Sequence, residues 1–405
     1  MRSTSQLLFS ILIYLALEIY LFNGVRSLFN KSKKKVFYWV YTCITAFAIL
    51  SVIIMFAFRG QMSASVINIF LGIFIINFIS KLVLLLFVIL DDLRRLGILA
   101  RNMKVKTESG ISRSAFLQKA GLISASVPLV ALSTGIAIGG AYRYKVHKKK
   151  LTFKNLPLAF NGLKIVQISD IHSGSFYDKE AVKKGVQMII DQKPDVVFFT
   201  GDIVNSLATE MTDYYDVFDK ITAPMGVYSI LGNHDYGDYE QWPNDEARTQ
   251  NFEDIKAIHG KLGWKLLLDE HIYLEKEKEK IAVIGVENWG SGFHKIGDLA
   301  KAYQNCEADF KILLSHDPTH WDEEVTKDYL DIDLTLSGHT HGAQMGIETH
   351  NFKWSPIQLR YSKWAGLYSK GKQHLYINRG FGFLGYPGRI GIWPEITLLE
   401  INRTT

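Results

Sequence analysis

The 405-residue sequence predicts an α/β domain preceded by an N-terminal region of membrane-spanning helices. Three observations carry this prediction. Long apolar runs are confined to residues 1–142. From residue 151 onward, short β-branched runs alternate with helical stretches, which is typical of a sheet covered by helices. The two parts also differ in charge: residues 1–150 hold 20 Lys and Arg against four acidic residues, whereas the remainder holds 26 basic and 36 acidic residues.

The apolar region contains four stretches that are long enough to span a bilayer as helices. They are residues 7–22, 36–58, 66–90 and 120–142, and the fourth is rich in small residues and carries Pro128. Basic residues follow the first and third stretches, whereas only Arg59 lies between the second and third. The positive-inside rule therefore predicts that both basic loops are cytoplasmic and the N-terminus is outside. The alternative for each stretch is a buried helix of a soluble domain.

The basic excess next to these stretches indicates membrane topology and membrane lipids as partners, and it gives no argument for nucleic-acid binding. The net charge of −10 on residues 151–405 also argues against a nucleic-acid partner.

A fourth crossing would place the rest of the chain outside the cytoplasm. Residues 112–119, Ser-Arg-Ser-Ala-Phe-Leu-Gln-Lys, resemble a twin-arginine export signal, although a serine stands in place of the second arginine. The basic cluster of Arg143, Lys145 and residues 148–150 argues for the opposite orientation. We expect an integral, multi-pass membrane protein with an extracytoplasmic domain at residues 161–405, joined to the region 1–142 by a basic linker at 143–160.

Glu18 and Lys81 are the charged residues within the first three apolar stretches. Such side chains are costly in hydrocarbon unless they are paired or hydrated. The predicted topology brings both to a similar depth, so we expect the first and third helices to be neighbours and Glu18 to face Lys81. The alternative is that each side chain extends independently to the interface.

In the α/β part, polar side chains of one chemical kind follow most of the predicted strands. These strands are residues 163–168, 196–200, 227–231, 281–286, 312–315 and 332–337, and a helix with an Asp cap is predicted at 178–192. Ligands bind at the carboxyl ends of strands in open α/β sheets, so we expect these side chains to converge. Their Asp, His and Asn groups suit divalent cations of intermediate hardness. The candidate ligands are Asp170, His172, Asp202, Asn233, His316, His339 and His341.

Five sequence blocks in this order resemble the calcineurin-like metallophosphoesterase superfamily. They are Asp-x-His at 170–172, Gly-Asp at 201–202, Gly-Asn-His-Asp at 232–235, His316, and Gly-His-Thr-His at 338–341. The segments Asn-Arg-Gly at 378–380 and Pro-Glu-Ile-Thr at 394–397 are similar to the bacterial membrane-associated branch, which includes phosphodiesterases and enzymes that cleave UDP-2,3-diacylglucosamine. The resemblance covers about residues 160–401 and implies a four-layer αββα sandwich of two mixed sheets.

The resemblance also implies roles for the site residues. Asp170, His172, Asp202 and His341 would hold one divalent ion, and Asp202, Asn233, His316 and His339 would hold a second, with Mn, Fe or Zn all suited to these ligands. A hydroxide shared by the two ions would attack the phosphorus of a phosphodiester or pyrophosphate. His234 would donate a proton to the leaving oxygen, and Asp235 would either orient the ring of His234 or cap a turn.

Other features leave alternatives open. The substrate is expected to be a phosphoester, with a lipid-linked compound as one option. A signalling or scaffold protein with reduced activity is the alternative function, and the intact ligand set argues against it. Arg379 and Arg389 would either clamp a phosphate or form a salt bridge or a membrane-surface contact. The aromatic residues of the C-terminal part would either lie in the core or contact lipid; they are Trp354, Tyr361, Trp364, Tyr368, Phe381 and Phe383.

Overall fold

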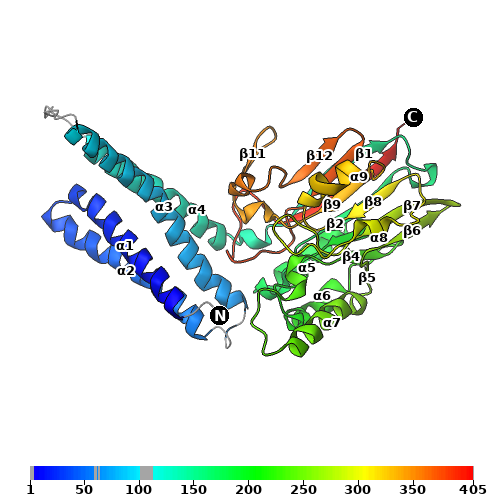
Figure 1. The fold of residues 1–405 in the computed structure, drawn as a ribbon, viewed down its shortest axis with the longest axis horizontal. Coiled ribbons are helices and arrows are strands. Elements are labelled where there is room, and N and C mark those ends of the chain that lie inside the picture. Colours follow the sequence, from blue (N-terminus) through cyan, green and yellow to red (C-terminus); the bar gives the residue numbers. More distant parts are fainter. Residues whose placement is uncertain (1–3, 59–61, 63, 101–112, 405) are drawn as a thin grey trace. The chain divides into compact units, whose positions relative to one another are not determined.

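The computed structural model describes residues 4–58, 62, 64–100 and 113–404. The chain forms two compact units, Met1–Ile138 (unit 1) and Gly139–Thr405 (unit 2). Figure 1 colours both by sequence. Several residues behind the topology and export predictions lie outside the described ranges, namely Arg59, Arg101, Lys104, Lys106 and Ser112.

Four long helices make up the described part of unit 1. They are α1 (Thr4–Val25), α2 (Lys31–Phe58), α3 (Ala64–Ala100) and α4 (Arg113–Ala137), and a 3₁₀ turn at Arg26–Leu28 follows α1. All four are long and apolar enough to cross a membrane, as predicted. The third helix extends ten residues beyond the predicted stretch 66–90, and the fourth ends at Ala137 instead of residue 142. Large apolar side chains such as Trp39, Leu86 and Leu93 are exposed, as expected for helices that face lipid.

Small residues allow the helices of unit 1 to approach closely. A Cβ atom on Gly24 of α1 would lie 2.7 Å from Val88 of α3, and one on Gly121 of α4 would lie 2.8 Å from Phe87. Glycine is common at such crossings, because helix association in a membrane depends on close packing. The contacts place α1 and α4 against the same segment of α3.

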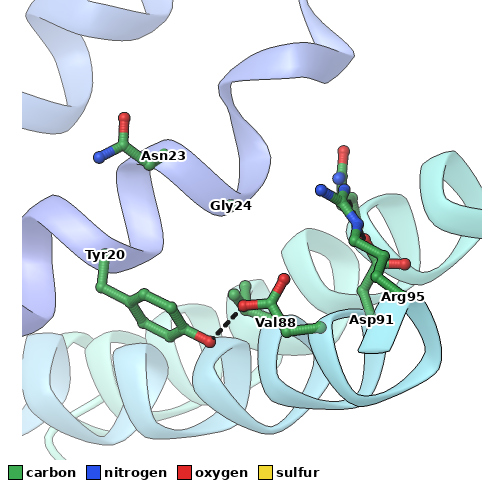
Figure 2. Close-up of a pocket in the computed structure, with 8 residues that line it drawn as sticks. Tyr20, Asn23, Gly24, Val88, Asp91 and Arg95 are labelled. Carbon is green, nitrogen blue, oxygen red and sulfur yellow. Dashed lines mark hydrogen bonds and ion pairs between the residues drawn. The ribbon is translucent and has the colours of Figure 1, made fainter. Parts of the chain in front are cut away.

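Polar groups cluster beside this crossing around a cavity of about 200 Å³ (Figure 2). The Tyr20 hydroxyl donates a 2.7 Å hydrogen bond to Asp92. The buried carboxylate of Asp91 accepts hydrogen bonds from Arg94, Arg95 and Ser114, and Ser114 belongs to α4. These bonds satisfy the acidic groups within the cluster and connect α3 to both α1 and α4.

Glu18 and Lys81 form an ion pair, as predicted, with 2.6 Å between Oε2 and Nζ. Both residues are buried. The Tyr41 hydroxyl of α2 also donates to the Glu18 carboxylate, and the Lys81 ammonium lies 3.4 Å from the centre of the Tyr41 ring. The pair therefore joins α1 to α3, and Tyr41 adds α2 to the same polar cluster.

Unit 2 contains two six-stranded mixed sheets. The first sheet has the order β1 (Lys145–Phe153), β14 (Glu395–Arg403), β2 (Leu163–Ile168), β3 (Val196–Thr200), β4 (Val227–Ile230) and β5 (Lys265–Leu266). The second has the order β12 (Gly366–Lys370), β13 (Gln373–Ile377), β9 (Leu334–Ser337), β8 (Lys311–Leu314), β7 (Glu279–Gly285) and β6 (Glu270–Lys276). Strands β2 to β5 are parallel, as are β7, β8, β9 and β13.

Alternating side chains of these strands build the four predicted layers. Ile165 of β2 packs in the core between the two sheets, whereas its neighbour Val166 packs on the opposite face, against helices. Helices α5 (Lys179–Ile190), α6 (Tyr215–Phe218) and α7 (Asp245–Lys261) supply the layer on the first sheet. A π turn at Trp321–Val325, α8 (Leu299–Tyr303) and α9 (Thr326–Asp328) flank the second sheet.

The predicted elements lie close to the observed ones. Strands β2 and β3 have the predicted limits, and Asp178 caps α5 by accepting a 3.0 Å hydrogen bond from the amide of Ala181. The segment 143–160 is a correction, because it is not a linker. Residues Lys145–Phe153 form β1, which pairs in parallel with β14 along its full length. Its lysines are exposed because β1 is an edge strand, which explains why its composition resembled a linker.

Candidate metal centre

The seven candidate ligands follow five strands of the two sheets. Asp170 and His172 come after β2, Asp202 after β3, and Asn233 begins a 3₁₀ turn after β4. In the second sheet, His316 follows β8, and the pair His339 and His341 follows β9. The chain therefore brings the ligands to the carboxyl edges of both sheets, where parallel strands leave their last residues together.

The backbone at these positions is strained. Five of the seven ligands have positive φ angles: Asp170 (52°), His172 (48°), Asp202 (62°), His339 (72°) and His341 (49°). A left-handed conformation costs a residue with a Cβ atom about 1–2 kcal/mol. Strain of this kind clusters at functional sites, where the surrounding structure holds the residues in place.

Two glycines allow the ligand loops to approach one another. A Cβ atom on Gly232 would lie 2.2 Å from Oδ1 of Asp202, and one on Gly338 would lie 2.3 Å from Oδ2 of Asp170. No side chain fits at those distances, so only glycine permits this packing. Gly232 and Gly338 directly precede the candidate ligands Asn233 and His339, so these close approaches bring the ligand loops together.

Asp170, His172 and His341 form the first group of ligands. The Nε2 atoms of His172 and His341 are 3.0 Å apart, and Nε2 of His341 is 3.2 Å from Oδ1 of Asp170. Two nitrogens bound to one cation at about 2.1 Å each would have a similar separation. The Asp170 carboxylate also accepts the amide of His339 at 3.0 Å, which connects the first group to the loop of the second.

Asp202, His316 and His339 form the second group, and Asn233 joins it. Nδ1 of His339 lies 2.9 Å from Oδ1 of Asn233 and 3.3 Å from Nε2 of His316. Oδ2 of Asp202 lies 3.1 Å from Nε2 of His316 and 3.6 Å from Nε2 of His172. Asp202 therefore lies between the two groups, at a position from which one carboxylate could bind both metal ions.

The buried charges of the centre affect one another. Burial lowers the pKa of His316, but the Asp202 and Asp170 carboxylates and the Thr200 carbonyl together outweigh burial and raise this pKa to about 10. Burial alone would raise the pKa of Asp202, and the positive charge of His316 holds it well below its usual range instead. The pKa of His339 falls to about 4, mainly because of burial. The Asp202 carboxylate thus stays ionised at neutral pH and attracts positive charge into the centre.

The ring nitrogens show that the residues fit cations. Nδ1 of His316 lies 2.7 Å from the carbonyl oxygen of Thr200, so this nitrogen carries a hydrogen, and Nε2 faces Asp202 and holds a proton when no cation is bound. A lone pair facing a carboxylate oxygen is stable only with a proton or a metal ion between them. Backbone or carboxylate bonds to the far nitrogen are also how metal-ligating histidines are oriented. We conclude that the two groups can hold two divalent ions.

The ring of His234 is held by Asn205 and Tyr239, and Asp235 does not orient it. Its Nδ1 lies 2.7 Å from the carbonyl oxygen of Asn205, and its face stacks on Tyr239 with 4.3 Å between ring centres. The Asp235 carboxylate instead accepts the amides of Asp202, Ile203 and Gly232 at 2.8–2.9 Å. Asp235 therefore holds the turns that carry the ligands, which was the alternative to orienting His234.

Other residues at the centre lie outside the sequence motifs. Oδ2 of Asp317 and the hydroxyl of Tyr361 lie 3.5 and 2.8 Å from Nε2 of His339, so both can orient that ring. Glu210 accepts the amides of Asn205 and Leu207 and thereby fixes the loop that holds His234. Asp317 directly follows a predicted ligand, which is the one available sequence indication. Every residue has a backbone carbonyl, so the contact between His234 and the carbonyl of Asn205 cannot be predicted from residue type.

The two arginines of the C-terminal segment are buried and do not form a phosphate clamp. Arg379 forms ion pairs with Glu348 and Glu395, which confirms the salt-bridge alternative. Arg389 donates to the carbonyl oxygens of Gly382 and His341, which matches neither alternative. Burial lowers the pKa of Arg389 to about 9. Both side chains therefore brace the loops behind the ligands.

A cavity of about 490 Å³ adjoins the second group of ligands. Asn233 forms part of its wall, and aromatic and apolar side chains form much of the rest; they include Tyr236, Tyr239, Phe293 and Ile296. The ring of Phe293 contacts that of His339, with 4.9 Å between ring centres. A cavity of this size beside the ligands can hold part of a substrate.

The fold is an αββα sandwich that carries two groups of candidate metal ligands at the carboxyl edges of its sheets, and two family models match the chain. Residues 163–343 match the family model "Calcineurin-like phosphoesterase", and residues 2–140 match "Probable Calcineurin-like phosphoesterase, transmembrane domain". The chain belongs to the calcineurin-like metallophosphoesterase family.

Three curated relatives are similar to this chain over most of its length. The metallophosphoesterase YkuE of Bacillus subtilis is 31% identical over 289 residues, which cover 68% of this chain and 94% of YkuE. A transmembrane protein with a metallophosphoesterase domain from Danio rerio is 27% identical, over 77% of this chain and 68% of that protein. Phosphodiesterase YaeI of Escherichia coli is 26% identical, over 72% of this chain and 99% of YaeI.

Proposed function

We propose that this chain is a membrane-anchored phosphoesterase that uses two metal ions to hydrolyse a phosphodiester or pyrophosphate bond. The observation that carries the proposal is the position of Asp202 between two groups of ligands, 3.1 Å from His316 and 3.6 Å from His172. Two bound cations supply an activated water and neutralise charge on the phosphoryl oxygens. The identity of the metal is left to measurement, since Mn, Fe and Zn all suit these ligands.

His234 is the proposed proton donor to the leaving oxygen. The Asn205 carbonyl and the Tyr239 ring hold its imidazole, which leaves Nε2 as the nitrogen that can reach substrate. Asn205 and Glu210 are positioning residues in this scheme, because they act through His234 and do not contact the substrate themselves.

Hydrolysis of bis-p-nitrophenyl phosphate with added Mn²⁺ tests the activity. Each metal ion contributes several kcal/mol, and each 1.4 kcal/mol is tenfold in rate, so Asp202→Ala should lose about 10³-fold or more. Asp328→Ala is the matched control, because Asp328 is exposed on α9. Equal rates for the two variants would overturn the proposal and favour the alternative, a scaffold with reduced activity. The complete ligand set supports the hydrolase.

The leaving group tests the role of His234. General acid catalysis is worth about 10²–10⁴-fold for a poor leaving group. His234→Ala should therefore slow alkyl phosphodiesters by this factor and nitrophenyl esters much less, because nitrophenolate leaves without a proton. Equal losses on both substrates would show that His234 acts in another way.

A lipid-linked substrate is supported by the attachment of the domain to apolar helices and by the apolar wall of the cavity beside Asn233. The relative YaeI is named a phosphodiesterase, which favours a diester over a monoester. A panel of phosphodiesters, monoesters and lipid phosphates, offered to the detergent-solubilised chain, distinguishes these classes.

We also propose that unit 2 lies outside the cytoplasm. Basic residues follow α1 and flank the C-terminal end of α3 and the start of α4, which favours cytoplasmic placement of both loops. Four crossings then return the chain to the outer side. A reporter fused after residue 405 that is active only in the cytoplasm would contradict this orientation.

A further inference from the structure

The short ribbon formed by β10 (Ile347–Glu348) and β11 (Lys353–Trp354) has its polar face towards the protein. Ile347 pairs with Trp354, and Glu348 pairs with Lys353, so each pair shares one face of the ribbon. Glu348 forms an ion pair with the buried Arg379. Lys353 donates to the carbonyl oxygen of Ala365 and to the hydroxyl of Tyr368. The charged pair therefore faces unit 2, and the apolar pair faces away from it.

The apolar face of this ribbon is exposed. Ile347 is 56% exposed and Trp354 is 45% exposed. Phe352, before β11, is 57% exposed, and Leu359, in the 3₁₀ turn at Pro356–Leu359, is 92% exposed. A hairpin that faces water ordinarily turns its apolar side chains inward. The reversed arrangement, with four large apolar groups within 13 residues, indicates a surface that is covered by a partner.

The membrane is the partner that best fits this surface. The helices of unit 1 anchor the same chain, so a bilayer is present at a high effective concentration. Trp and Phe next to a cation are typical of segments that lie in the interface, and the exposed Arg360 follows Leu359 directly. We propose that residues 347–359 insert into the boundary between lipid headgroups and acyl chains.

Both ends of this segment are fixed to the metal centre. It begins three residues after the 3₁₀ turn at His341–Gln344, which contains a ligand. It ends two residues before Tyr361, whose hydroxyl lies 2.8 Å from Nε2 of His339. Insertion would hold the centre close to the headgroup region. The inference rests on the exposed face and the membrane anchor, and it holds whether or not the proposed hydrolysis is correct.

Site-specific fluorescence on the full chain in lipid nanodiscs tests the contact. In a Cys43→Ala background, Phe352→Cys and Leu359→Cys would each carry an environment-sensitive dye. Cys306 is buried, so the unsubstituted background provides the blank for labelling. Leu330→Cys is the matched control, because Leu330 is a 69% exposed leucine of unit 2 outside this segment.

We expect lipids with a nitroxide near the headgroup to quench the dyes at 352 and 359 by more than half and to leave the dye at 330 nearly unchanged. Unaltered metal content would show that the labelled variants are folded. Equal quenching at all three positions, or none at 352 and 359, would overturn the proposal. Quenching that occurs only in nanodiscs with two chains would overturn it as well, since it would indicate a contact between copies.

Discussion

Unit 1 and unit 2 each bury charged groups, but they compensate them in opposite ways. In unit 1, the single carboxylate of Glu18 meets the single ammonium of Lys81, and the Tyr41 hydroxyl completes the cluster. In unit 2, the carboxylates of Asp170 and Asp202 lie 3.2 and 3.1 Å from ring nitrogens of His341 and His316. The charges of the first cluster compensate each other within the protein. The second is balanced only by protons or metal ions taken up from solution, and this difference distinguishes a packing element from a binding site.

The largest effect should come from breaking the pair of Glu18 and Lys81. Removal of one partner of a buried ion pair costs about 3–5 kcal/mol, because the other charge is left alone in a low dielectric. Glu18→Lys should therefore strongly reduce the yield of folded chain in membranes, and the double variant Glu18→Lys with Lys81→Glu should restore much of it. Size-exclusion recovery from detergent is the measurement. If the double variant is no better than the single one, the pair does not hold α1 against α3.

Metal addition should have an effect of similar size, confined to unit 2. A ligand at 1,000 times its Kd stabilises the folded state by about 4 kcal/mol. Seven of the eight tryptophans lie in unit 2, so intrinsic fluorescence during heating follows that unit. Mn²⁺ should raise the midpoint of this transition, and Asp202→Ala should abolish the rise. A shift that survives Asp202→Ala would place the bound metal elsewhere.

The smallest effect should come from replacing Asp317, whose side chain contacts the candidate ligand His339. Oδ2 of Asp317 lies 3.5 Å from Nε2 of His339, and loss of such a partner typically weakens metal binding about 10–100-fold. Asp317→Asn should raise the metal concentration needed for half-maximal activity by this factor, with little change in the rate at saturating metal. Asp333→Asn is the matched control, because Asp333 is buried but bonds Lys311 and Asn155 away from the ligands. Equal changes in both variants would mean that Asp317 serves only folding.

The sequence predicted features that depend on residue type and order along the chain. Buried strands such as β2 have composition and alternation that define their limits, and the ligands follow the strands directly. The Glu18–Lys81 pair was predictable because a membrane leaves an isolated charge few alternatives. Two features required the structure. The lysines of β1 concealed a strand whose register depends on β14, and His234 is held by a backbone carbonyl that every residue type possesses.

The position of β14 affects how unit 2 can form during synthesis. This strand, residues 395–403, lies between β1 and β2, which it pairs in parallel and antiparallel fashion respectively. The ribosome therefore releases β1 and β2 some 230 residues before the strand that joins them. Until then β1 is an unpaired edge next to membrane-inserted chain, and such edges are prone to wrong pairing. Glu395, the first residue of β14, also anchors Arg379. Closure of the first sheet and bracing of the ligand loops should thus occur together, after β14 has been synthesised.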